Sequence, residues 1–134
     1  MSHEHYETQE GVCYEEPRIH WDKDKSIWVT DDATCWVDES RFIYVPAGFE
    51  TDLATIPNIF RPVWSTYGKH NRAVIVHDWF YKHRGALPDG ETFTRQEADR
   101  IMYDIMKEDG VSWFYRYSMW VAVRTSPTNI FQGW

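Results

Sequence analysis

The sequence lacks several features that would place a protein in a class at once. Its two cysteines, Cys13 and Cys35, form no CxxC motif and no Cys/His spacing of the zinc-binding type. No apolar run approaches the roughly 20 residues that span a membrane, and Arg116 interrupts the most apolar stretch, 113–123. Basic residues are scarce, with 14 Lys and Arg against 21 Asp and Glu. The net charge of −7 argues against general nucleic-acid binding, which needs a basic surface.

The start of the chain has no signal-peptide pattern, because residues 1–7 are polar and acidic. We therefore expect no signal peptide, and we expect Cys13 and Cys35 to be reduced, partly buried thiols. A disulfide between them is the alternative if the protein works outside a reducing cytosol.

Aromatic residues, in contrast, are abundant, at 17% of the 134 residues. Such side chains bury large areas, and the length suits one domain with a sizeable core. We expect a single domain over 1–134, divided into a polar N-terminal segment at 1–16, a β region at 17–50 and a helical region at 51–134.

The β region carries short β-branched and aromatic runs at 27–29, 34–37 and 42–45, separated by acidic turns. This sequence pattern is typical of antiparallel strands joined by short connections. The fold class predicted from the whole pattern is α+β, a small antiparallel β-meander followed by three packed α-helices.

The helices have recognisable ends. The first long helix is expected over 71–84. Thr94 and Glu97 fit a capping box at the start of the second helix, and Gly110 fits its C-terminal end. A third helix is expected over 113–125.

The candidate site lies on the first two of these helices. His77 and Tyr81 are four residues apart and share one helical face, whereas Asp78 points about 100° away. Asp99 lies at the margin of the apolar stripe of the second helix. If the two helices pack together, Asp99 can hold one nitrogen of His77, which leaves the other nitrogen to take a proton from water. Tyr81 can then support the same carboxylate.

Two carboxylates are candidate metal ligands. Asp78 and Asp52 could bind a hard cation such as Ca²⁺ together with backbone carbonyl oxygens. The simpler alternatives are that Asp52 caps a short helical turn, that His77 makes an ordinary core hydrogen bond, and that Asp99 is structural.

Four motifs in order resemble a family of phage and prophage proteins catalogued as domain of unknown function 1353. They cover about residues 40–125 and read Val45-Pro-Ala-Gly-Phe-Glu-Thr-Asp-Leu-Ala-Thr-Ile-Pro57, Tyr67-Gly-Lys69, Ala73-x-x-x-His-Asp-x-x-Tyr81 and Arg95-x-x-Ala-Asp99. The resemblance implies a phage or prophage origin, a location in the host cytoplasm or the virion, and phage structural proteins as partners.

A more local similarity concerns chemistry. His77-Asp78-x-x-Tyr81 with Asp99 on the next helix is similar to the core of phospholipases of the A-two type. That resemblance implies that His77 activates water, Asp78 binds calcium, Asp99 orients His77 and Tyr81 supports Asp99. The glycine-rich calcium loop and the bracing disulfides of those enzymes have no counterpart here.

Two functional hypotheses follow. One is a small hydrolase that uses the His77–Asp99 dyad on a lipid or other ester, with a metal-dependent variant that adds Asp78 and Asp52. The other is a non-enzymatic virion or tail component, or a host-interaction factor.

Overall fold

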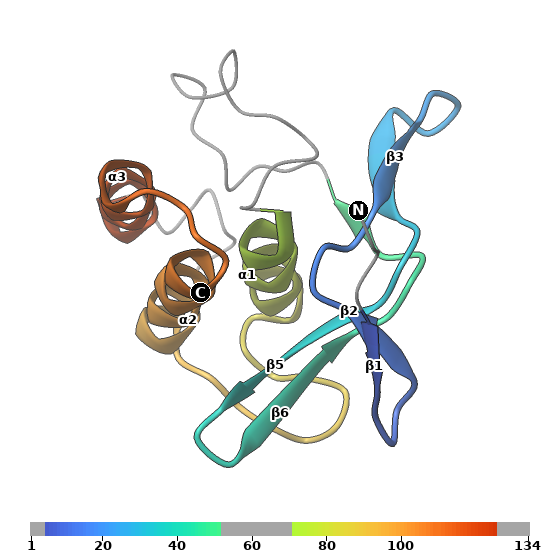
Figure 1. The fold of residues 1–134 in the computed structure, drawn as a ribbon, viewed down its shortest axis with the longest axis horizontal. Coiled ribbons are helices and arrows are strands. Elements are labelled where there is room, and N and C mark those ends of the chain that lie inside the picture. Colours follow the sequence, from blue (N-terminus) through green and yellow to red (C-terminus); the bar gives the residue numbers. More distant parts are fainter. Residues whose placement is uncertain (1–4, 52–70, 126–134) are drawn as a thin grey trace.

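A computed structural model describes residues 5–51 and 71–125 of the chain. Three short antiparallel sheets lie on one side of the molecule and three helices on the other (Figure 1). This arrangement confirms the predicted α+β class. Within the described residues, no helix has the length and apolar character needed to cross a membrane.

The strands pair in small sets. The first sheet contains β1 (His5–Glu7) and β2 (Val12–Tyr14), and the third contains β5 (Thr34–Asp38) and β6 (Arg41–Val45). The second sheet has the order β3-β4-β7, formed by β3 (Ile19–Asp22), β4 (Ile27–Thr30) and β7 (Glu50–Thr51).

The expected meander is therefore divided, because β4 pairs with β3 and β7 and not with β5. The contacts of the segment after β4 give the reason. The backbone N–H and the guanidinium of Arg18 both donate to Asp32, at 2.9 Å for the two bonds to Oδ2. The backbone N–H of Asp31 donates to the Arg18 carbonyl at 2.7 Å. These bonds hold the segment against residue 18, so that it does not form a tight hairpin turn.

Within the polar N-terminal segment, residues 5–14 form the β1–β2 hairpin. The Tyr14 N–H donates to the Ala33 carbonyl at 2.9 Å, and the Thr34 hydroxyl donates to the Tyr14 carbonyl at 2.8 Å. These bonds attach the hairpin to β5.

The two cysteines lie inside this junction. Both are free and buried, as predicted, and the Cys35 thiol donates to the Tyr6 hydroxyl at 3.0 Å. Burial and a hydrogen bond with Cys35 raise the pKa of the Cys13 thiol to about 12.

The helices match their predicted limits closely. They are α1 (Asn71–His83), α2 (Arg95–Glu108) and α3 (Trp113–Thr125). The capping box is present at α2, where the Glu97 N–H donates to the Thr94 hydroxyl at 3.1 Å and the Thr94 N–H donates to Glu97 Oε1 at 2.9 Å. Gly110 follows α2 with a φ of 84°, a left-handed conformation that glycine adopts at low cost.

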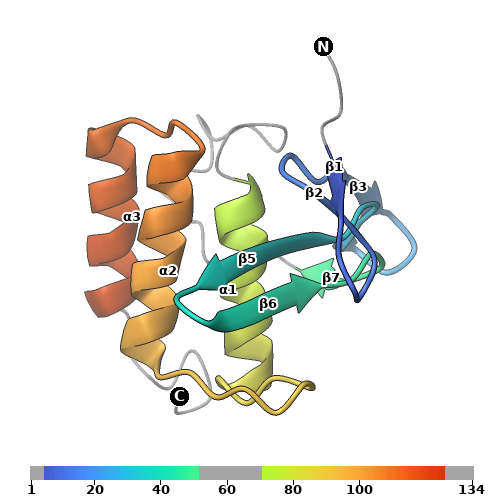
Figure 2. The ribbon, with the colours of Figure 1, turned by 60° about the horizontal axis from the view of Figure 1, so that its bottom comes forward.

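The core lies where α1 is enclosed. α2 contacts both α1 and α3, and the β5–β6 hairpin crosses α1 on another side (Figure 2). Most side chains of α1 are accordingly buried, and the largest fully buried side chains of the core are Phe80, Ile19, Ile43, Ile75, Ile101, Met102, Ile105, Met106 and Met119. α1, which carries the candidate histidine His77, is thus the helix against which α2 and the β5–β6 hairpin pack.

Two arginines, Arg72 and Arg41, each connect separate elements through ion pairs with two carboxylates and a contact with an aromatic ring. Arg72, 4% exposed, pairs with Glu108 at 2.7 Å and Asp109 at 2.6 Å, and its guanidinium lies 5.1 Å from the centre of the Trp36 ring. This cluster joins the start of α1 to the end of α2.

The second arginine, Arg41, pairs with Asp38 at 2.8 Å and Glu97 at 2.6 Å, and its guanidinium lies 4.1 Å from the centre of the Phe93 ring. This cluster joins the β5–β6 hairpin to the start of α2. Each arginine thus lies over one aromatic ring and pairs with two carboxylates, which balance its charge and accept hydrogen bonds from it.

We expect Thr94→Ala to lower the free energy of unfolding by about 1 kcal/mol, because it removes the side-chain acceptor of the capping box. Urea denaturation measures this loss. Thr94→Ser keeps the hydroxyl and is the control, with a stability close to that of the parent chain. Equal loss in both variants would show that the cap hydrogen bond is not the cause.

Candidate functional site

His77 and Asp99 meet at the interface of α1 and α2. His77 Nε2 lies 2.6 Å from Asp99 Oδ1, and both side chains are 0% exposed. The contact predicted from helical spacing is therefore confirmed. It exists because α1 is buried on nearly all faces, which places a polar residue of its interior against the margin of the apolar stripe of α2.

Asp99 receives further donors. The Tyr81 hydroxyl donates to Oδ1 at 2.8 Å, as predicted, and the Arg124 guanidinium donates to Oδ2 at 2.8 Å. A buried carboxylate is stable only when it is paired and hydrogen-bonded. The three donors come from α1 and α3, so this one carboxylate of α2 connects all three helices.

A second arginine supports the tyrosine. Arg95 Nε donates to the Tyr81 hydroxyl at 3.1 Å, and another nitrogen of Arg95 donates to the Val123 carbonyl at 2.8 Å. Tyr81 is therefore held between a cation and a carboxylate, with its hydroxyl proton directed at Asp99.

Burial and the surrounding groups shift the pKa values of Asp99 and Tyr81. Burial by itself raises the pKa of Asp99, but the hydrogen bonds from His77, Tyr81 and Arg124 outweigh it and lower that pKa below 3.8. Burial and the nearby charge of Asp99 raise the pKa of Tyr81 above its ordinary value. At neutral pH Asp99 is thus an acceptor and Tyr81 a donor.

The geometry fixes the tautomer of a neutral His77. Because an ionised carboxylate only accepts, the proton of the imidazole lies on Nε2, and Nδ1 is the basic nitrogen. The ring centroid of Tyr81 lies 4.3 Å from that of His77 and limits rotation of the imidazole. A carboxylate-oriented imidazole of this kind is suited to accept a proton from water.

Asp78 lies apart from this group. It is half-buried on α1, and its carboxylate accepts a hydrogen bond from the Thr51 hydroxyl. Its predicted partner in a metal site, Asp52, lies outside the described residues.

The part of the chain that the structure describes holds no group of three or more metal-ligating side chains. A calcium ion takes six to eight oxygen ligands, so Asp78 with Thr51 does not supply a fitting set. The calcium site stays a prediction.

Three residues of the site were not predicted from the sequence. Arg124 and Arg95 hold Asp99 and Tyr81, and Thr51 holds Asp78. The signal for Arg124 in the sequence is that a basic residue lies in the last turn of an apolar helix, which does not indicate its partner 25 residues earlier.

We expect Tyr81→Phe to lower the free energy of unfolding by about 1.5–3 kcal/mol near pH 7, since it removes a hydrogen bond to a buried charge. The folded-state pKa of Asp99 is lowered, so the stability that this bond provides is present above the ordinary pKa of 3.8. It is lost as the pH falls through the lower folded-state value. The cost of Tyr81→Phe therefore shrinks towards pH 2, as urea denaturation at a series of pH values can measure.

The matched control is Tyr103→Phe on α2, where no hydroxyl bond to Asp99 is lost, so the cost should be small at every pH. A cost of Tyr81→Phe that is the same at pH 7 and pH 2 would contradict the ionised state of Asp99.

Comparison with known proteins identifies a family. Residues 28–123 match the family model described as protein of unknown function (DUF1353). Neither a curated protein nor a solved structure matches the chain. The matched residues span β4 to α3 and include His77, Tyr81, Asp99 and Arg95. Since they make up more than half of the sequence, the chain belongs to the DUF1353 family.

Proposed function

We propose that this protein hydrolyses carboxylic esters, with His77 as the general base and Asp99 as the residue that positions it. The observation that carries the proposal is the 2.6 Å contact between His77 Nε2 and Asp99 Oδ1. The second donor on the same oxygen, Tyr81, and the pairing of the other oxygen with Arg124 add support, because they keep Asp99 ionised and fixed.

The reaction proceeds in two steps. Nδ1 of His77 takes a proton from water while the water oxygen adds to the ester carbonyl carbon, which gives a tetrahedral oxyanion and an imidazolium. The oxyanion then collapses, the bond to the leaving alkoxide breaks, and the imidazolium returns its proton to the alkoxide. Asp99 stays ionised throughout and stabilises the imidazolium through its contact with Nε2.

The substrate class that we favour is a glycerophospholipid ester. The support is the similarity of His77-Asp78-x-x-Tyr81 and Asp99 to the phospholipase A-two type, together with the side-chain contacts described above. A general base of this kind contributes a factor of about 10²–10⁴ in rate.

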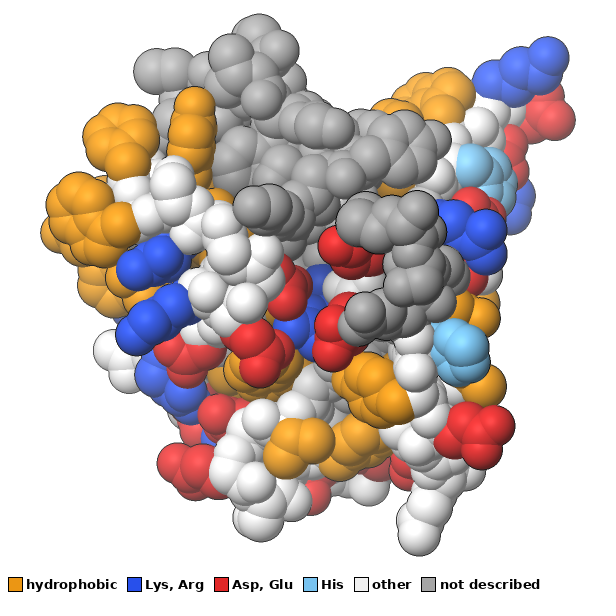
Figure 3. Space-filling view, in the orientation of Figure 1, with side chains coloured by type: hydrophobic (Ala, Val, Ile, Leu, Met, Phe, Trp, Pro, Cys, Tyr) orange, Lys and Arg blue, Asp and Glu red, His pale blue; other side chains and the backbone are white. Residues whose placement is uncertain are grey.

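A second candidate is a non-enzymatic component of a phage particle or a host-interaction factor, acting in the virion or the host cytoplasm. Two observations favour it. His77 and Asp99 are both 0% exposed, which suits an internal tie between helices. α3 also exposes Trp113 (61%), Phe114 (62%) and Tyr117 (47%) on its outer face, where hydrophobic side chains gather (Figure 3). Large exposed aromatic groups are typical of surfaces that contact a partner.

His77→Gln separates the two candidates. Glutamine keeps a donor for Asp99 but has no basic nitrogen. For a hydrolase we expect the turnover of mixed phospholipid vesicles and of a soluble ester to fall by a factor of about 10²–10⁴, with a near-normal melting temperature. Assays with and without added calcium also test the metal prediction for Asp78 and Asp52.

His83→Gln is the control, because His83 is the last residue of the same helix and is not part of the Asp99 group. It should retain the parent activity. An inert parent protein, combined with a loss of about 1–3 kcal/mol of stability in His77→Gln, would refute the hydrolase and support the non-enzymatic candidate.

A further inference from the structure

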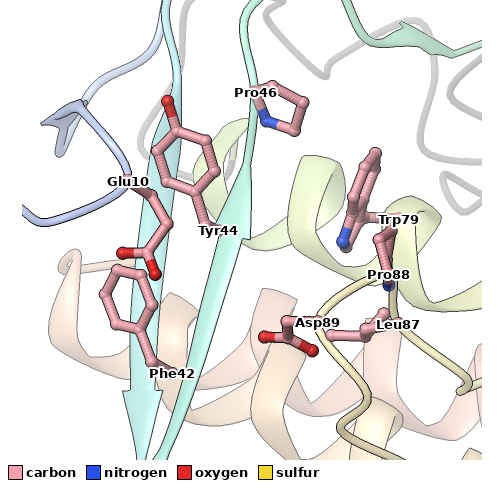
Figure 4. A pocket seen from close by; sticks show the side chains of 8 residues that line it. All are labelled: Glu10, Phe42, Tyr44, Pro46, Trp79, Leu87, Pro88 and Asp89. Carbon is pink, nitrogen blue, oxygen red and sulfur yellow. The ribbon is translucent and has the colours of Figure 1, made fainter.

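A surface cavity on the sheet side of the molecule is separate from the His77–Asp99 group. Its volume is about 320 Å³, and it lies between β6, α1 and the loop that joins α1 to α2 (Figure 4). Its walls carry three aromatic side chains, Phe42, Tyr44 and Trp79, and two carboxylates, Glu10 and Asp89. The carboxylates lie on opposite sides of the cavity, Glu10 in the β1–β2 turn and Asp89 in the loop after α1.

This set of side chains resembles two sites elsewhere in the molecule that hold an arginine, because all three combine aromatic rings with two carboxylates. Arg72 lies over Trp36 and pairs with two carboxylates. Arg41 lies over Phe93 and likewise pairs with two carboxylates. In both cases the guanidinium carbon lies over an aromatic ring and carboxylates accept from the guanidinium nitrogens, a combination that suits a guanidinium.

The cavity differs from these two sites in having no cation of its own. Neither Glu10 nor Asp89 takes part in an ion pair among the described residues, and the hydrogen bond that Asp89 accepts comes from the Glu91 backbone N–H, at 3.0 Å. Both carboxylates are exposed. The walls thus present two carboxylates and three aromatic side chains to a ligand that enters.

We propose that this cavity binds an arginine side chain of a partner protein. Its volume lies at the lower end of the range for small-molecule sites, about 300–1,000 Å³, and suits one long side chain. The two carboxylates lie on exposed turns, so a guanidinium can reach them while the backbone of the partner stays outside. A lysine ammonium fits less well, because it cannot stack on the flat walls and form paired hydrogen bonds at the same time.

The experiment is a titration of ¹⁵N-labelled protein with a blocked peptide, Gly-Gly-Arg-Gly-Gly, followed by amide chemical shifts. We expect saturable shifts at Phe42, Tyr44 and Leu87, which line the cavity. The same peptide with citrulline in place of arginine has nearly the same shape without the charge and should cause no such shifts. A lysine peptide should bind more weakly than the arginine peptide.

Isosteric variants test the two carboxylates. Glu10→Gln and Asp89→Asn should each weaken binding of the arginine peptide by about two- to fivefold, the size expected for exposed ion pairs, and the double variant should weaken it further. Glu7→Gln, an exposed carboxylate of the same hairpin outside the cavity, is the matched control and should bind like the parent. Melting temperatures verify that each variant is folded.

Three results would overturn the proposal: equal binding of the citrulline peptide, shifts confined to other surfaces, or unchanged affinity in the double variant. Tighter binding of free agmatine than of the arginine peptide would assign the cavity to a small guanidinium compound instead of a protein partner. The outcome is independent of the hydrolase proposal, since none of these variants touches His77, Asp99 or their contacts.

Discussion

The buried carboxylate of Asp99 is the constraint on which the helical half of the protein depends. A charge in the interior is tolerated only when donors surround it, and here His77 and Tyr81 on α1 and Arg124 on α3 provide them. The three helices can therefore pack only in positions that bring these donors together. The hydrogen bonds to Asp99 that fix the helices therefore also orient the imidazole of His77.

Much of the helical part could be predicted from local sequence signals. The ends of α2 follow from Thr94, Glu97 and Gly110, which act on neighbouring backbone groups, and the His77–Asp99 contact follows from helical periodicity and the packing of adjacent helices. The strand pairing could not be predicted in the same way. It depends on contacts such as Arg18–Asp32, which join residues 14 positions apart and leave no periodic pattern. Arg124 was missed for the same reason.

Arginine has two different structural uses in this acidic chain. Arg72 and Arg41 connect separate elements through clusters in which one cation meets two carboxylates. Arg124 instead compensates a carboxylate that is already bonded to two other groups. Because each of these ion pairs is at least partly removed from water, each depends on the presence of its partner more strongly than an exposed pair does.

The junction between the N-terminal hairpin and β5 has a consequence for chemical reactivity. The Cys13 thiol is buried and its pKa is raised to about 12, so very little thiolate is present at neutral pH. Alkylating reagents act on thiolates, and they can reach this one only when the hairpin separates from β5. The rate at which a maleimide modifies Cys13 therefore reports how often this edge of the molecule opens.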